Sequence, residues 1–478
     1  MLTYTLSAEY STPLYEQLVQ ALRSDILSGH LPPGSRLPSK RSLSGNLGVS
    51  SITVENAYNR LIDEGFVWSE PKRGYFVTDL GGRNIRTALA AADTASVPVL
   101  NRESIRLPDE PPAAVLDLSG NRTPSERFPF SVWTHLMRET VNQKGEALLT
   151  PSPCGGVRPL REAIAEHLNS FRGMRLDPDQ IIVGAGTEYL YGLLIQLLGR
   201  TRVFCLEDPG YRKIAQIYSA HGVRCRYAAM DLAGLTVTGL ERARADIAHI
   251  SPTHHYPTGI TMPISRRYEL LSWANAEADR YIIEDDYDSE FRLTGRPIPS
   301  LQSIDKGGRV IYMNTFSKTL SATFRISYMA LPPALANKFY RQLSFYACTV
   351  SSFEQYTLAG FISGGYFEKH LNRMRLYYAR LRKQLLDVID SSAVSSRLTV
   401  LERDSGLHFL LRIDTEVPDA ELRRTLLEHG VNLLPISVYY QDTSSAPPHT
   451  FVLNYSSLSS DELEKALRIL AQLIEKPH

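Results

Sequence analysis

Cysteine is scarce in this chain of 478 residues, and no Cys-x-x-Cys pair occurs among its four widely separated cysteines, Cys154, Cys205, Cys225 and Cys348. This spacing predicts reduced thiols and argues against a disulfide framework or a zinc site. The sequence also lacks a run of about eighteen apolar residues, and no charged segment followed by an apolar one opens it. We therefore expect neither a membrane span nor a secretory signal, and we expect a cytoplasmic protein.

A strong charge of either sign is also missing, because the formal net charge is +1, a value that indicates no class of partner. The hydrophobic fraction of 43% and the charged fraction of 22% are typical of soluble globular proteins. A chain of this length exceeds what one small core requires, so two or more domains are expected.

The pattern of the chain changes twice along its length. Residues 10–80 are dense in short helical patterns, which predicts a separate first domain. Residues 81–113 are polar, rich in alanine and punctuated by proline, which is typical of a linker. Across residues 114–478, apolar strand-like runs alternate with helical patterns, which predicts an α/β sheet with crossover helices.

The first domain combines three helical patterns with a hairpin pattern. Apolar residues recur every fourth position until the first pattern stops at Gly29, which predicts one helix. Ser39 precedes a second, short helix, and Ser50 is placed as the N-cap of a third helix after a glycine turn. Strand-like segments at 66–68 and 75–77 flank a basic turn. Two helices joined by a glycine-containing turn and followed by a hairpin predict a winged helix-turn-helix.

The tips of this domain carry groups that suit double-stranded promoter DNA. Hydroxyls and helix N-termini bind phosphates, and basic side chains neutralise them. The residues expected to contact DNA are Ser39, Lys40, Arg41, Ser50, Ser51, Thr53, Lys72 and Arg73. Because residues 1–80 contain seven Lys and Arg against eight Asp and Glu, a protein-binding winged helix with solvated charges is the alternative.

The same segment resembles the GntR-type winged helix over most of its length. The resemblance is carried by Pro-Leu-Tyr, Gly-Ser-Arg-Leu-Pro-Ser-Lys-Arg and Leu-Gly-Val-Ser, at 13–15, 34–41 and 47–50. The family usually has arginine where this chain has Ser51, so a base contact worth roughly 1–3 kcal/mol is missing there. We therefore expect Arg41 to read bases, with Arg73 on the minor groove or a phosphate.

The second domain contains a lysine whose setting suits a Schiff base. Lys318 follows the apolar run 310–313 and the polar pair Asn314 and Thr315, and Arg325 lies seven residues further on. A lysine that holds pyridoxal phosphate needs a partly desolvated amine and nearby donors for a phosphate. A solvated loop lysine is the plainer interpretation of the same residues.

Two further strand-like runs end in groups that this cofactor would use. A glycine turn ending in Gly186 precedes a helix that opens at Thr187, which predicts an anion site. Tyr189 stands where a dinucleotide-binding pattern needs glycine, so one phosphate fits better than a pyrophosphate. Tyr211 follows another run and can stack on a planar ring. Alternatively, the glycines serve only tight packing of the helix on the strand, and Tyr211 is only a surface anchor.

Asp285 and Tyr287 follow a fourth apolar run, and strand alternation places them on one face, with Asp286 on the other. A carboxylate facing a pyridinium nitrogen keeps that nitrogen protonated, and a phenol can bind the ring hydroxyl. Metal binding is a competing interpretation, but His254 and His255 are not spaced as ligands, so we expect no metal. Because ligands of open α/β sheets bind at the carboxyl ends of strands, the four runs together predict pyridoxal phosphate.

The order of these motifs resembles fold-type I aminotransferases, and with the first domain it resembles the MocR/PdxR subfamily of GntR-type regulators over nearly the whole chain. The resemblance implies a mostly parallel central sheet, a small C-terminal α+β subdomain, and a homodimer with domain-swapped heads. It also implies roles for individual residues. These are a Schiff-base (aldimine) role for Lys318, ring contacts from Asp285, Tyr287, Tyr211 and His254, and phosphate contacts from Gly186, Thr187, Thr315 and Arg325.

One departure from that family concerns the substrate. Aminotransferases hold the substrate α-carboxylate with an arginine on a late strand, whereas the late run 451–455 offers Asn454. Arg212 and Lys213 are the residues expected to bind an effector anion instead. We therefore expect a transcriptional regulator that senses an amine, an amino acid or the B6 cofactor, with weak transaminase activity at most. The alternatives are a working aminotransferase with an accessory winged helix, and a DNA-binding protein that has lost its cofactor.

Overall fold

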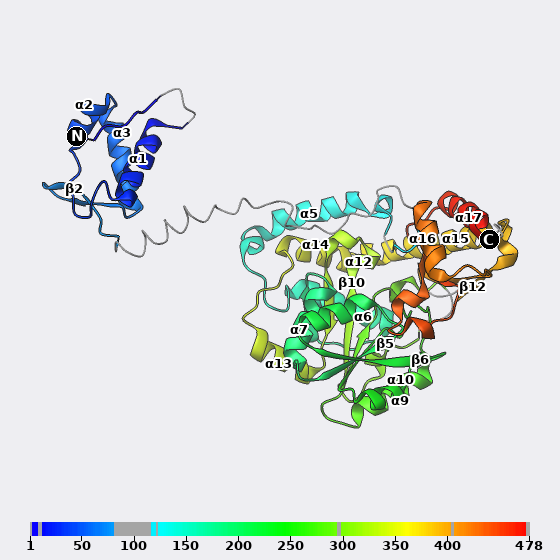
Figure 1. Cartoon of the computed structure of the whole chain (residues 1–478). Helices are drawn as coiled ribbons and strands as arrows, with labels where there is room; N and C mark the ends of the chain where they lie inside the picture. The colour runs from blue at the N-terminus through cyan, green and yellow to red at the C-terminus, as the bar shows by residue number, and fades with distance from the viewer. Residues whose placement is uncertain are drawn as a thin grey trace. The chain divides into compact units, whose positions relative to one another are not determined.

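The structure is a computed structural model that describes residues 2–7, 12–80, 116–120, 123–293, 298–402 and 406–474. The chain divides into two compact units, Met1–Glu110 and Pro111–His478, whose elements are labelled in Figure 1. The predicted linker, residues 81–113, lies outside the described residues.

The first unit is the predicted winged helix-turn-helix. Its elements are α1 (Leu14–Ser28), α2 (Lys40–Leu47), α3 (Ser51–Asp63), β1 (Val67–Glu70) and β2 (Gly74–Val77). Helix α1 ends at Gly29, whose φ of 85° is a left-handed value that glycine adopts without strain. The Ser39 hydroxyl accepts from the Ser42 N–H at 3.1 Å, and the Ser50 hydroxyl accepts from the Thr53 N–H at 3.0 Å. The predicted N-cap Ser50 is thus confirmed, and Ser39 caps α2 in the same way; each cap is worth about 1 kcal/mol of helix stability.

A small apolar core holds the three helices and the hairpin together. Leu18, Leu22, Val54 and Leu61 are fully buried, and they come from α1 and α3. Burying each such side chain stabilises the fold by about 1.5–3 kcal/mol. The Tyr58 hydroxyl donates to the carbonyl oxygen of Pro38, the residue before Ser39, at 2.9 Å. This bond fixes α3 against the segment that leads into α2, so the two helix N-termini keep a defined spacing.

The second unit is built around an eight-stranded sheet with the strand order β4-β11-β10-β9-β8-β5-β6-β7. The strands are β4 (Ile181–Gly184), β5 (Val203–Asp208), β6 (Arg224–Asp231), β7 (Gly234–Leu235), β8 (Ile247–Ile250), β9 (Tyr281–Asp285), β10 (Val310–Thr315) and β11 (Ser327–Ala330). The five strands from β10 to β6 pair in parallel, whereas β11 and β7 are antiparallel to their neighbours. The predicted mostly parallel sheet is confirmed. Because β4 and β10 both run against β11, the carboxyl ends of β4, β5, β8, β9 and β10 share one edge.

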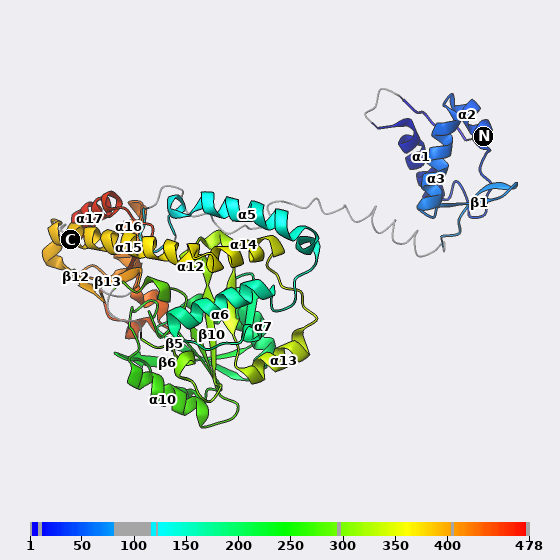
Figure 2. The same cartoon turned by 180° about the vertical axis from the view of Figure 1, so that it is seen from behind.

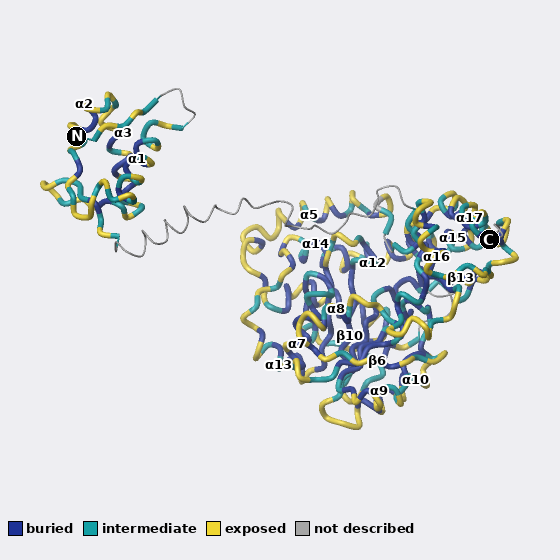
Figure 3. The backbone as a smooth tube through the Cα atoms, viewed as in Figure 1, coloured by how far each residue is buried: buried dark blue, intermediate teal, exposed yellow. Residues whose placement is uncertain are grey.

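Helices cover both faces of this sheet. They are α6 (Arg158–Arg172), α7 (Thr187–Leu198), α8 (Arg212–Ala220), α9 (Val237–Ala243), α10 (Ile264–Asn275), α11 (Leu301–Ile304), α13 (Pro333–Leu343) and α14 (Ser352–Ser363). Ile283 of β9 packs with residues of α7, α8 and α13, whereas its neighbour Ile282 packs with residues of α9, α10 and α11. Strand alternation therefore feeds two separate apolar layers. Figure 3 shows the central strand β10 in the dark blue of buried residues.

A smaller α+β part completes the second unit, as predicted. Its antiparallel sheet has the order β12-β13-β16-β15, and two helices and the long α15 accompany it. The bounds are β12 (Leu398–Leu401), β13 (His408–Ile413), β15 (Leu434–Pro435), β16 (Thr450–Asn454), α15 (Tyr366–Ser391), α16 (Asp419–Glu428) and α17 (Ser460–Ile474). A short parallel pair, β3 (Leu116–Asp117) with β14 (Val431–Asn432), ties the beginning of the unit to this part.

Helix α5 (Phe130–Lys144) lies beside α14. The long helix α15 extends from α14 to α17, as Figures 1 and 2 both show. Within the described ranges, none of the helices has the length and apolar character that a membrane span requires.

Candidate functional site

One cavity of about 410 Å³ opens at the shared carboxyl edge of the large sheet. Nine of the side chains that the sequence singled out line it: Thr187, Tyr211, Arg212, Lys213, Asp285, Tyr287, Thr315, Lys318 and Arg325. Eight of them lie at or after the ends of four strands, β4, β5, β9 and β10, because parallel strands deliver their carboxyl ends to one edge, and Arg325 lies just before β11. Gly186 and His254 are the two remaining predicted residues, and each adjoins this group.

Lys318 lies just past the end of β10, in the single turn α12 (Phe316–Thr319). Burial lowers the pKa of its amine, and the nearby carboxylate of Asp288 opposes that shift. The Thr123 hydroxyl donates to the Lys318 carbonyl oxygen at 3.0 Å, and His370 Nε2 lies 2.8 Å from the Thr319 carbonyl oxygen. These two contacts hold the backbone carbonyls of Lys318 and Thr319 in place. The lowered pKa increases the share of neutral amine that can attack a carbonyl carbon.

Asp285 ends β9 at the floor of the cavity and is only 5% exposed. The Tyr191 hydroxyl donates to its Oδ2, and His249 Nε2 lies 3.4 Å from the same oxygen. Tyr218 in turn places its hydroxyl 2.7 Å from His249 Nδ1. Asp285 Oδ1 is buried, and no described residue bonds to it. The carboxylate is thus fixed through one oxygen, and the other can accept one more N–H.

Tyr287 lies on the same side of the chain as Asp285, as strand alternation predicts, and lines the cavity. Its hydroxyl donates to the His254 carbonyl oxygen at 2.9 Å, and burial raises its pKa well above the ordinary value. The His254 ring lies outside the cavity lining, because its Nδ1 lies 2.9 Å from Asp288 Oδ1. Gly406 packs over that pair, since an added Cβ there would lie 2.7 Å from Asp288 Oδ2. His254 therefore contacts the cavity residue Tyr287 through its backbone carbonyl, whereas its ring contacts Asp288.

Tyr211 stands on the cavity rim at the N-cap of α8 and is 51% exposed. Tyr256 lies edge-on to it, with ring centroids 6.0 Å apart, and lines the inner wall. The Tyr256 hydroxyl is 2.7 Å from that of Tyr439. An exposed aromatic face on the rim, with a fixed aromatic wall behind it, can hold a planar ring.

Gly186, Thr187 and Arg325 form a concave group at the N-terminus of α7. Gly186 has a φ of 91°, and a Cβ added to it would lie 2.4 Å from Arg325 Nη2, so the arginine occupies the space that any side chain would need. The first N–H groups of a helix and an arginine together favour an anion. Thr315 lines the cavity, but its Oγ1 already accepts from the Ser317 N–H at 3.1 Å. The Ser317 side chain also lines the cavity and adds a hydroxyl that the sequence reasoning did not assign.

The predicted effector contacts are both present on the rim, with partners of their own. Arg212 Nη2 donates to the Tyr440 carbonyl oxygen at 3.1 Å, and Lys213 forms an ion pair with Glu188. Among the described lining residues, the cations are Arg212, Lys213, Lys318 and Arg325.

The late strand β16 brings no cation towards the cavity. Asn454 is fully buried outside the cavity lining, and its Oδ1 accepts from the Ser456 N–H at 3.1 Å. Val452 of the same strand packs with Leu410 and Tyr439, in an apolar cluster that contacts Tyr256 of the cavity wall. None of the described lining residues comes from β16, so this strand adds no charge to the cavity.

The acids next to Asp285 have partners other than a metal. Asp286 binds Arg172 in a buried ion pair, and Glu284 lies 3.4 Å from Arg267. Within the described part of the chain, no group of three His, Cys, Asp or Glu side chains is placed to hold a metal ion.

In the first unit, the residues predicted to contact DNA are grouped at helix N-termini and at the hairpin tip. Lys40 Nζ is 2.5 Å from Glu55 Oε1, and Arg73 Nη1 is 2.6 Å from Glu70 Oε1. Arg41 is exposed in the first turn of α2. The hydroxyls of the group bond locally, with 2.8 Å between Ser50 Oγ and Thr53 Oγ1 and 3.2 Å between Ser51 Oγ and Ser44 Oγ. Lys72, with a left-handed φ of 64°, is also exposed.

One residue of this surface was missed by sequence reasoning. Ile52 is 68% exposed at the second position of α3, between Ser51 and Thr53. An exposed aliphatic side chain at the start of such a helix can contact a thymine methyl group.

Besides Ser317, the polar cavity residues to which sequence reasoning gave no role include Glu188, Tyr191, Glu207, His249, Ser251 and Tyr256. Two of them carried a signal. His249 interrupts the otherwise apolar strand Ile247–Ile250, and Tyr191 lies one helical turn after Thr187 on the same helix face.

Comparisons with known proteins account for both units. The family described as "Bacterial regulatory proteins, gntR family" matches residues 14–77, and "Aminotransferase class I and II" matches residues 113–470. Solved structures share the fold of the second unit. A multiple substrate aminotransferase from Thermococcus profundus superposes with a TM-score of 0.67 at 24% identity, over 76% of this chain and 92% of that one. An archaeal alanine:glyoxylate aminotransferase gives 0.68 at 23% identity, over 79% and 93%.

Curated relatives match both units together. "Uncharacterized HTH-type transcriptional regulator YdeL" of Bacillus subtilis is 34% identical over 98% of each chain. "Probable rhizopine catabolism regulatory protein MocR" of Rhizobium meliloti is 32% identical over 97% of this chain and 94% of its own. "HTH-type pyridoxine biosynthesis transcriptional regulator PdxR" of Corynebacterium glutamicum is 29% identical over 99% and 98%. The chain therefore belongs to the MocR/PdxR subfamily of GntR-type regulators, in which a winged helix-turn-helix precedes an aminotransferase class I and II domain.

Proposed function

We propose that this protein is a transcriptional regulator that depends on pyridoxal phosphate. Its first unit binds double-stranded promoter DNA in the cytoplasm. Its second unit holds the cofactor and responds to a small amine, to an amino acid or to the B6 cofactor itself. Membership of the family supports this two-part function, since regulators with both units are its curated members.

The observation that carries the proposal is the meeting of Lys318 and Asp285 in one cavity. When bound, pyridoxal phosphate supplies an aldehyde that reacts with amines and a ring that withdraws electrons. Lys318 has a lowered pKa and provides the amine that attaches the cofactor. Asp285 Oδ1, which no described residue bonds, can accept the N–H of the ring nitrogen. The geometry of both groups fits the cofactor.

The remaining contacts divide between the phosphate and the ring. Gly186, Thr187 and Arg325 hold the phosphate at the start of α7, where helix N–H groups and a guanidinium favour an anion. Tyr287 stays protonated because burial raises its pKa, and its oxygen can accept from the ring hydroxyl. Tyr211 stacks on the ring from the rim. Arg212 and Lys213 meet an anionic group of the effector.

Lys318→Ala tests the attachment directly. The variant should lose the visible absorbance of the lysine-bound cofactor and leave no cofactor on the chain after borohydride reduction. Lys369→Ala, at an exposed position on α15, is the matched control and should keep both signals. A cofactor that borohydride still fixes to Lys318→Ala would show that another amine carries it.

We further propose a homodimer with domain-swapped heads. Large apolar side chains on α5 and just beyond it support a second copy as the partner, since Phe130 is 64% exposed and Leu149 is 79% exposed.

An active aminotransferase is the second candidate function. It is supported by the complete cofactor set and by 24% identity to "Aromatic-amino-acid aminotransferase 1" of Thermococcus litoralis, over 76% of this chain. The composition of β16 argues against it, because aminotransferases hold the substrate α-carboxylate with an arginine on a late strand, and β16 has neither arginine nor lysine. Rapid multiple-turnover formation of a keto acid from an ordinary amino acid would favour the enzyme.

A further inference from the structure

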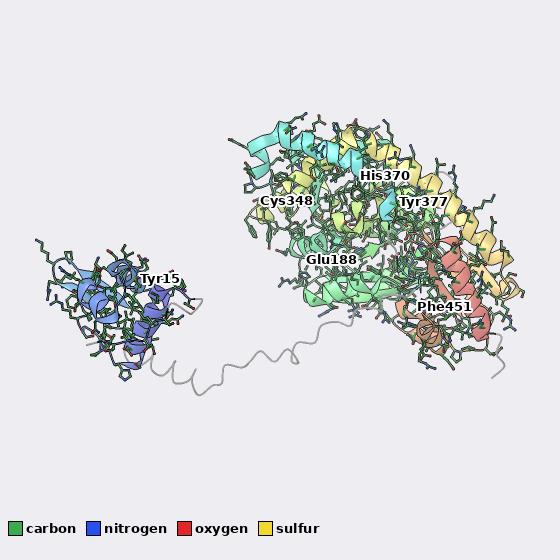
Figure 4. All side chains as sticks on the ribbon, turned by 90° about the horizontal axis from the view of Figure 1, so that it is seen from above. Tyr15, Glu188, Cys348, His370, Tyr377 and Phe451 are labelled. Carbon is green, nitrogen blue, oxygen red and sulfur yellow. The ribbon has the colours of Figure 1, made fainter. Side chains whose placement is uncertain are left out.

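A carboxylate lies inside the proposed phosphate site. Glu188, labelled in Figure 4, is the second residue of α7 and lines the cavity. Its Oε2 lies 3.1 Å from Arg325 Nη2, and its Oε1 forms an ion pair with Lys213. The ion pair with Lys213 is also the main cause that lowers the pKa of Glu188, so the carboxyl is ionised at neutral pH. One anion therefore already binds two of the four cations of the cavity.

The shared atom is Nη2 of Arg325. The same nitrogen lies 2.4 Å from where a Cβ of Gly186 would stand, at the helix N-terminus where a phosphate would bind. A phosphate in that position and the Glu188 carboxylate would draw on one guanidinium. Glu188 also places a second negative charge beside that phosphate, and like charges repel.

We propose that Glu188 competes with the cofactor phosphate for Arg325 and so keeps pyridoxal phosphate exchangeable. This inference rests on the proposed function, because it assumes the cofactor at this site. All three side chains are between 40% and 50% exposed, so solvent screens the competition in part. We expect Glu188 to weaken phosphate binding by about tenfold, equivalent to about 1.4 kcal/mol. A chain built in this way responds to the concentration of its cofactor instead of holding it permanently.

Glu188→Gln removes the charge and keeps the shape of the side chain. Dissociation constants of pyridoxal phosphate and of pyridoxal, which lacks the phosphate, are measured by absorbance titration of the full chain. The variant should bind pyridoxal phosphate about tenfold more tightly and pyridoxal as wild type does. Glu464→Gln removes the same charge from an exposed arginine pair on α17 and should change neither constant.

Unchanged or weaker binding of pyridoxal phosphate by Glu188→Gln would overturn the inference, because Glu188 would then serve to orient Arg325. If that variant fails to fold, Lys213→Met provides the test. Without Lys213, Glu188 pairs with Arg325 alone and competes more strongly for it. Pyridoxal phosphate should then bind several-fold more weakly, and the affinity for pyridoxal should not change. An unchanged dissociation constant for pyridoxal phosphate would contradict the inference. The proposed function fails separately: it is excluded if wild type binds neither compound, or if Lys318→Ala binds both compounds as tightly as wild type does.

Discussion

Glu207 is a buried acid of the cavity wall. Its protonation state can be tested through the pH dependence of the unfolding free energy. It is 8% exposed, its Oε2 accepts from the Ser251 N–H at 2.9 Å, and His255 Nε2 lies 3.4 Å away. Burial raises the pKa of Glu207 from 4.5 to about 8, and the charge of Asp285 adds to that rise. Burial also lowers the pKa of His255 to about 3, so this ring stays neutral and brings no positive charge to Glu207.

The raised pKa fixes the direction of the pH dependence. Between pH 4.5 and about 8 the folded chain keeps the Glu207 proton, while the unfolded chain has released it. The contribution of the neutral carboxyl to stability is therefore complete below pH 4.5 and is lost as the pH rises towards about 8. One pKa unit corresponds to about 1.4 kcal/mol, so wild type should lose roughly 3–4 kcal/mol of unfolding free energy between pH 5 and 8 relative to Glu207→Gln.

The measurement is urea unfolding of both proteins across this pH range, followed by the fluorescence of the buried Trp133 and Trp273 of the second unit. Glutamine cannot ionise, yet its amide oxygen can still accept from Ser251. All other titrating groups are common to both proteins, so the difference between the curves isolates Glu207. Glu464→Gln should run parallel to wild type. Parallel curves for wild type and Glu207→Gln would refute a neutral Glu207 in the cavity wall.

Two further predictions concern the phosphate site and the DNA surface. Gly186→Ala should weaken pyridoxal phosphate binding at least tenfold, because the added Cβ would meet Arg325 at 2.4 Å. Gly173→Ala, with a φ of 67° and no atom within 4 Å of its added Cβ, should not, and equal affinities would contradict the phosphate site. Replacing Lys72 and Arg73 together by alanine should flatten the log–log salt dependence of promoter binding by roughly 0.9 per lost phosphate contact. Arg424→Ala in the second unit should leave that slope unchanged, and an unaltered slope in the double variant would remove the hairpin tip from the DNA surface.

Local signals explain what could be predicted from the sequence. Ser50 was identified as an N-cap, and Ser39 as the residue before a helix, because capping depends on the residue itself and on the next three positions. The cavity lining was predicted because Thr187, Asp285 and Lys318 each follow an apolar strand, and parallel strands bring their ends together.

The rest depends on contacts between distant segments. Tyr191 reaches Asp285 across 94 positions, and Tyr256 meets Tyr439 across 183, so no local pattern reveals either pair. His254 was expected at the cofactor ring, yet its ring bonds Asp288, a partner that a sequence pattern could not select.

We propose that chemistry at Lys318 changes how the first unit binds DNA. The direct measurement is the occupancy and bending of promoter DNA next to the gene of this protein, with the full chain in the presence and absence of pyridoxal phosphate and then of added amines. A ligand shifts the protein almost fully from one state to the other only if it binds one state roughly 10⁴-fold more tightly. A weaker preference gives a partial change in promoter occupancy, which also counts as a response. The account predicts a response in wild type and none in Lys318→Ala. An equal response in both proteins would contradict it.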